Sequence, residues 1–154
     1  RLDALQAAIL QVKLRYLDTW NAQRWQAAQR YQQLLSGIAG LILPQALPDA
    51  QSAWNQYTIR LSQPIQALRQ QESNYRDQVQ RQLQQQGISS TVYYPLPLHL
   101  QPVYQFLGYQ PGQLPVAERL AQEVLSLPIF PELYPEEQAQ VAHSLKDCLV
   151  QPEL

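Results

Sequence analysis

The chain has 154 residues, 45% of them hydrophobic and 15% charged, with a formal net charge of −1 at pH 7. This length suffices for about one domain with its own hydrophobic core. The near-neutral charge, without a stripe of lysine and arginine, argues against nucleic acid as a partner. The sequence contains no run of about 18 apolar residues, so we expect no membrane-spanning helix.

The single cysteine, Cys148, cannot form an internal disulfide bond, which favours a reducing, cytoplasmic location. Its apolar neighbours Leu145 and Leu149 indicate a thiol packed in the core rather than a nucleophile. The sequence shows no cysteine and histidine spacing typical of a metal site, no glycine-rich phosphate loop and no nucleophile elbow. It therefore offers no catalytic or metal-binding motif of its own.

The first part of the chain, residues 1–36, is predicted to form one long helix. Apolar residues recur every three or four positions from Leu2 to Leu35, and no proline or glycine interrupts them before Gly37. Such a helix would be about 50 Å long, whereas a compact domain of this size is about 40 Å across. We therefore expect its first half to overhang and to pack on a partner subunit or on a further domain. The alternative is a break near Asn21.

Residues 37–154 are predicted to form a small C-terminal domain of the α/β class, in an α+β arrangement. Tyr57, Ile59 and Leu61 alternate with polar residues, a pattern typical of a half-buried strand. The order of strands and helices indicates a small, mostly antiparallel sheet of about three strands covered by helices. The predicted strands are 40–44, 56–61 and 88–94, the predicted helices begin at Pro64, Pro115 and Pro135, helical turns are expected at 103–107, and 125–131 is expected to be an extended apolar segment.

The stretch from Gly87 to Pro102 combines a strand-like run, three prolines and the side chains of Tyr93, Tyr94 and His99. Prolines fix the backbone, so a ligand bound here would cost little conformational entropy. Phenol and imidazole groups are suited to hydrogen bonding with a hydroxyl-rich or phosphorylated ligand. The residues alone fit a packing role equally well, in which the tyrosines pack and the histidine caps a backbone group.

The other ionisable residues are expected to be structural. We expect His143 to lie at the surface of the last helix. Neither Lys13 nor Lys146 has the apolar surroundings that a Schiff-base lysine requires. The acidic pairs are expected to be solvated rather than catalytic; they are Glu118 with Glu123 and Glu136 with Glu137.

Three stretches of the sequence resemble one known family. They are Gly87–Pro102 (GISSTVYYPLPLHLQP), Leu114–Leu120 (LPVAERL) and Glu123–Leu133 (EVLSLPIFPEL). In this order they resemble the C-terminal region of sugar-nucleotide aminotransferases of the DegT/StrS type. Residues 1–10 are similar to the start of this family's long helix, and residues 56–60 are similar to the central strand of its small domain.

The resemblance implies a pyridoxal-phosphate enzyme of the aspartate-aminotransferase fold, which acts as a homodimer with active sites at the subunit interface. Members of the family transfer an amino group, usually from glutamate, to a keto-sugar attached to a nucleotide. The cofactor lysine and its partner aspartate belong to the family's N-terminal domain, and no segment here matches either one. Because the chain also opens within a helix, we expect part of a longer enzyme that is inactive by itself.

The resemblance further implies that Tyr93, Tyr94 and His99 line the sugar side of the active site. Arg1 matches the last residue of the family's Gly-x-Asn-x-Arg motif, which places it near the cofactor or the subunit interface. The family often has histidine where this chain has Tyr93, so one substrate contact is expected to differ. The alternative hypothesis is a non-catalytic interaction module that uses its long helix as a docking arm.

Overall fold

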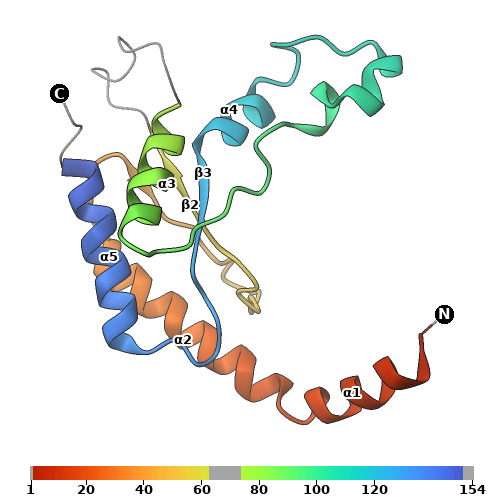
Figure 1. Cartoon of the computed structure of the whole chain (residues 1–154), viewed down its shortest axis with the longest axis vertical. Helices are drawn as coiled ribbons and strands as arrows, with labels where there is room; N and C mark the ends of the chain where they lie inside the picture. Colours follow the sequence, from red (N-terminus) through yellow and green to blue (C-terminus); the bar gives the residue numbers. More distant parts are fainter. Residues whose placement is uncertain (1, 63–73, 151–154) are drawn as a thin grey trace.

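The computed structural model describes residues 2–62 and 74–150. Its centre is an antiparallel sheet of three strands, in the order β1 (Leu41–Ile42), β2 (Tyr57–Leu61) and β3 (Val124–Leu127). The prediction of a small antiparallel sheet covered by helices is confirmed (Figure 1).

The described part of the chain contains five α-helices in addition to the sheet. None of these helices is long and apolar enough to cross a membrane. The helices expected from Pro115 and Pro135 are confirmed, whereas residues 64–73 of the helix expected from Pro64 lie outside the described residues. The helices are α1 (Ala4–Leu14), α2 (Leu17–Leu35), α3 (Tyr75–Gln85), α4 (Pro115–Glu123) and α5 (Pro135–Val150).

Strand β2 positions the core, because its side chains alternate between two environments. Tyr57, Ile59 and Leu61 are buried against side chains of α2, α3 and α5. On the other face, the Thr58 hydroxyl lies 2.8 Å from that of Ser126 on β3. The predicted half-buried strand is therefore confirmed, and cross-strand pairs hold it to its neighbour.

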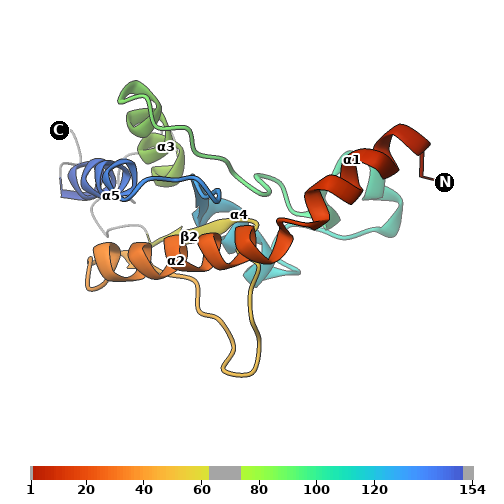
Figure 2. The same ribbon diagram turned by 90° about the horizontal axis from the view of Figure 1, so that it is seen from below.

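The predicted single helix over 1–36 is interrupted between α1 and α2, at residues 15 and 16, and not near Asn21. The amides of Arg15 and Tyr16 bond the carbonyls of Val12 and Lys13, which tightens the last turn and ends α1. Helix α1 buries no residue and extends away from the body in both views (Figures 1 and 2). Its large apolar residues are exposed, as expected for an overhanging segment.

The predicted strand 88–94 is wrong. This segment forms only one isolated antiparallel bridge, between Thr91 and Ser126, and the third strand is β3, which was expected only as an extended segment. Strand β3 pairs with β2 over four residues and buries Leu125 and Leu127. Ser89 and Ser90 have no apolar side chain to bury against a sheet face. Burial of apolar surface therefore favours β3 as the third strand.

Gln138 joins α5 to α2 through a completely buried side chain. Its amide nitrogen donates to the carbonyl of Ala27 at 2.5 Å, and its amide oxygen accepts from Nε of Arg30 at 2.7 Å. Arg30 also bonds the carbonyl of Leu133. This polar contact fixes the position of α5 against the helix that carries the core residue Tyr31.

The substitution Gln138→Ala should lower the free energy of unfolding by about 1–3 kcal/mol, because it removes two hydrogen bonds from the contact between α5 and α2. The matched change Gln140→Ala, at an exposed position of the same helix, should alter it by less than about 0.5 kcal/mol. Urea unfolding followed by circular dichroism measures both. Equal effects of the two substitutions would contradict the role given to Gln138.

Candidate functional site

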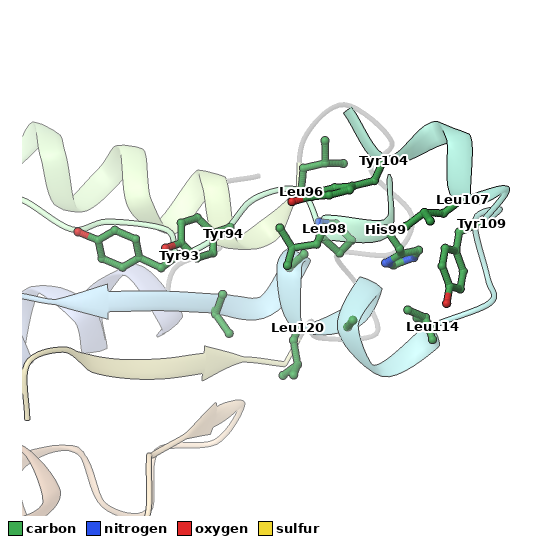
Figure 3. A pocket seen from close by; sticks show the side chains of 14 residues that line it. Tyr93, Tyr94, Leu96, Leu98, His99, Tyr104, Leu107, Tyr109, Leu114 and Leu120 are labelled. Atoms are coloured by element: carbon green, nitrogen blue, oxygen red, sulfur yellow. The ribbon is translucent and has the colours of Figure 1, made fainter. Parts of the chain in front are cut away.

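A cavity of about 690 Å³ lies between α4 and the segment that precedes it, and Tyr93, Tyr94 and His99 all line it. The structure thus brings together the three predicted site residues that it describes (Figure 3). Arg1 lies outside the described residues. The remaining lining is mostly apolar and aromatic, and comprises Leu96, Pro97, Leu98, Tyr104, Leu107, Tyr109, Leu114, Ala117, Leu120, Ala121 and Val124.

Two short 3₁₀ helices shape the wall opposite α4. They are η2 (Leu98–Leu100) and η3 (Pro102–Leu107). Helix η3 confirms the helical turns predicted at 103–107, whereas η2 was not predicted. Gly108 ends η3 with a φ of 76°, a left-handed conformation that glycine adopts without strain. The segment projects beyond the end of the sheet, away from the core (Figure 1). Every residue from Pro102 to Ala117 is exposed, so burial does not hold this wall in place.

Tyr93 and Tyr94 lie at one end of the cavity, and His99 lies with Tyr109 at the other (Figure 3). The two tyrosine rings meet edge to face at 5.8 Å, and 69% of Tyr94 is exposed. Within the described residues, neither hydroxyl forms a hydrogen bond. Both phenols are therefore available to a ligand.

His99 is buried, with only 8% of its surface exposed. Its Nε2 lies 3.1 Å from Oε1 of Glu118 on α4, and its ring meets the ring of Tyr109 at 6.0 Å. The prediction that Glu118 and Glu123 are solvated is wrong, because Glu123 also has a partner: its Oε2 accepts from Arg60 at 2.7 Å. The capping role considered for His99 is replaced by a bond to a carboxylate.

Glu118 also accepts two backbone N–H groups that precede α4, from Gly112 at 2.7 Å and from Leu114 at 3.2 Å. The bond from Gly112 lowers the pKa of Glu118 most. The bonds from His99 and Leu114 lower it further, while desolvation acts in the opposite direction. Sequence reasoning missed the role of Glu118, although a glutamate in the first turn of a helix suits the helix start. Glu118 therefore ties three parts of the cavity wall together.

The other candidates stand apart from the cavity. Cys148 is buried in the core, and this burial raises the pKa of its thiol, as expected for a packed residue. His143 is exposed, as expected. Among the described residues, no group of histidine, cysteine, aspartate and glutamate has the arrangement of a metal site.

The described residues do not form a pyridoxal-phosphate site by themselves. Neither Lys13, which is exposed on α1, nor Lys146, which is half-buried on α5, lines the cavity. Among the described lining residues there is also no arginine to bind a phosphate and no aspartate to face a pyridine nitrogen. The described residues at this cavity thus provide an aromatic and apolar wall.

The sequence matches the model of the DegT/DnrJ/EryC1/StrS aminotransferase family over residues 1–146. The chain belongs to this family. It is 47% identical to the erythromycin biosynthesis sensory transduction protein EryC1 of Saccharopolyspora erythraea, over 95% of this chain and 37% of that protein. It is 38% identical to the dTDP-3-amino-3,4,6-trideoxy-alpha-D-glucose transaminase of Streptomyces venezuelae, over 86% of this chain and 32% of that one.

The fold is that of solved members of the family. The crystal structure of S. venezuelae DesV superposes with a TM-score of 0.87 at 34% identity, over 99% of this chain and 38% of DesV. The chain therefore spans about a third of the length of the curated relatives it matches. The predicted family and fold class are confirmed.

The amide chemical shifts of Gly112 and Leu114 should change as the carboxyl group of Glu118 titrates. The midpoint should lie at a pKa below the ordinary value of 4.5. Because folding lowers this pKa, the stabilisation is complete above the ordinary value and is lost as the pH falls through the lowered one. NMR chemical shifts recorded against pH measure this titration. Glu118→Gln should abolish it, and a midpoint at or above 4.5 would contradict the assigned bonds.

Proposed function

We propose that this chain is the C-terminal part of a pyridoxal-phosphate-dependent aminotransferase that transfers an amino group from glutamate to a keto-sugar linked to a nucleotide. The observation that carries the proposal is the family match over almost the whole chain, residues 1–146. Further support comes from a relative named as a transaminase of a dTDP-linked sugar. A solved structural relative with bound pyridoxamine phosphate supports the cofactor.

In this proposal the chain supplies one wall of the substrate site. The hydroxyls of Tyr93 and Tyr94 donate to or accept from sugar hydroxyls, His99 contributes its imidazole, and the apolar residues of α4 exclude water from the far side. When bound, the cofactor supplies the electron sink for amino transfer. The lysine and aspartate that hold it come from the part of the enzyme that precedes this chain, with Arg1 near the cofactor or the subunit interface.

The exposed face of α1 supports a contact with the rest of a homodimeric enzyme. Leu5 and Ile9 are 76% and 60% exposed, and they lie on one side of the helix, four residues apart. Such a row of apolar side chains is unfavourable in water and favours coverage by another protein surface. The same row fits the alternative hypothesis, a non-catalytic module with α1 as a docking arm.

The two hypotheses differ in the sequence that precedes Arg1. An in-frame α/β domain with a lysine and an aspartate at the cofactor positions supports the enzyme. A start codon directly before Arg1 supports the interaction module. Reading the coding frame decides between them before any protein is made.

The longer polypeptide should bind pyridoxal phosphate, visible as cofactor absorbance, and should transfer the amino group of glutamate to dTDP- or UDP-linked keto-sugars. Mass spectrometry of the nucleotide-sugar product measures the transfer. The 154-residue chain alone is the matched control and should show neither property, because it lacks the cofactor residues. A longer polypeptide that never retains the cofactor would sink the proposal.

In that enzyme, Tyr94→Phe should raise KM for the keto-sugar about three- to tenfold, because one ligand hydrogen bond is lost. Tyr134→Phe is the matched control, since Tyr134 is similarly exposed, at 66%, and does not line the cavity. Steady-state kinetics with the keto-sugar as the varied substrate measure both. Equal KM values for the two variants would remove Tyr94 from the site.

A further inference from the structure

The contact between His99 and Glu118 determines which imidazole nitrogen carries a proton. Nε2 lies 3.1 Å from Oε1 of the glutamate. An ionised carboxylate only accepts hydrogen bonds, so Nε2 is the donor. In the neutral imidazole the other nitrogen, Nδ1, is then unprotonated and accepts.

Nδ1 of His99 is left for a ligand. Within residues 2–62 and 74–150, this nitrogen has no hydrogen-bond partner, although only 6% of the side chain is exposed. The residue nevertheless lines the cavity (Figure 3). Among the described side chains, the fully buried polar atoms without a partner are Nε1 of Trp54 and Oγ of Ser90, and Nδ1 of His99 is not one of them. This nitrogen is therefore accessible, and because the residue lines the cavity, a donor there can bond to it.

The carboxylate of Glu118 is itself held in place. The backbone N–H groups of Gly112 and Leu114 fix its two oxygens, and the position of Glu118 on α4 fixes its backbone. Tyr109 meets the imidazole edge to face and limits its rotation. The ring of His99 is therefore fixed both in orientation and in tautomer.

We propose that Glu118 is a positioning residue, which holds His99 as the Nε2–H tautomer so that Nδ1 accepts a hydrogen bond from a hydroxyl group of the ligand. In identifying this hydroxyl as one of the substrate's sugar, the inference rests on the proposed function. Glu118 does not line the cavity and acts only through His99. The ligand class is thus a hydroxyl donor at this end of the cavity, opposite the two tyrosines.

The tautomer can be observed directly in the 154-residue chain. It contains two histidines, so His143→Gln leaves His99 as the single imidazole. Long-range ¹H–¹⁵N NMR of the labelled protein at about pH 8 should show a protonated Nε2 and an unprotonated Nδ1. A protonated Nδ1, or an averaged pair of signals, overturns the inference.

Variants test whether Glu118 causes this state. Glu118→Ala should shift both nitrogen signals toward averaged values, whereas Glu118→Gln should restore the wild-type pattern, because its amide oxygen still accepts from Nε2. Glu137→Ala is the matched control: Glu137 accepts the amide of Tyr134 at 3.0 Å in the first turn of α5, without a histidine. An unchanged tautomer in a folded Glu118→Ala protein contradicts the role. If that variant does not fold, the tautomer of His99 in the protein with the native Glu118 still tests the inference.

In the longer enzyme, Glu118→Ala should raise KM for the keto-sugar about three- to tenfold, and Glu118→Gln should restore it. An unchanged KM in an alanine variant that has lost the tautomer overturns the ligand contact of Nδ1. Absence of amino transfer in the wild-type longer enzyme would overturn the proposed function instead. The tautomer measurement does not depend on that result, so the two failures are distinguishable.

Discussion

The cavity depends on one carboxylate, that of Glu118, and on the three N–H groups it accepts. The residues from Pro102 to Ala117 are all exposed, so this part of the wall has no buried side chain to hold it. The bond to His99 joins positions 19 residues apart and closes the segment between them into a loop. Closing such a loop limits the conformations of the residues inside it. A wall built from exposed residues can thereby keep a defined shape.

The wall is also tied to the sheet at a second point. Thr91 exchanges two backbone hydrogen bonds with Ser126, at 3.1 and 2.8 Å, and Ser126 belongs to β3. Strand β3 directly follows α4, the helix that carries Glu118. Tyr93 and Tyr94 thus lie between two anchors, Thr91 and His99, and both anchors lead back to the same strand and helix. The buried core of β2 and α2 provides the rigid platform for them.

Local sequence patterns correctly predicted those elements whose structure depends mainly on residues close in sequence. The alternation of Tyr57, Ile59 and Leu61 gave the central strand, and the prolines gave the starts of α4 and α5. The interruption before Leu17 could not be predicted, because exposed α1 carries the same apolar period as α2. The third strand could not be predicted either, because β3 pairs with β2 from a distant part of the sequence.

Part of the cavity lining was predicted from the sequence. Proline-fixed backbone and polar aromatic side chains pointed to the stretch with Tyr93, Tyr94 and His99, and the cavity brings them together. The partner of His99 could not be found, because a contact between η2 and α4 is a product of tertiary folding. The family match covers residues 1–146 and not just the stretch with Tyr93, Tyr94 and His99. It therefore assigns the chain to a family, which the residues of the cavity alone do not.

We propose that this chain forms the sugar-facing wall of an aminotransferase site. A crystal structure of the longer enzyme with a nucleotide-linked keto-sugar tests it most directly. We expect sugar hydroxyls within hydrogen-bond distance, about 2.7–3.2 Å, of Nδ1 of His99 and of at least one of the hydroxyls of Tyr93 and Tyr94. A sugar bound elsewhere, with this cavity filled by protein side chains, would contradict it.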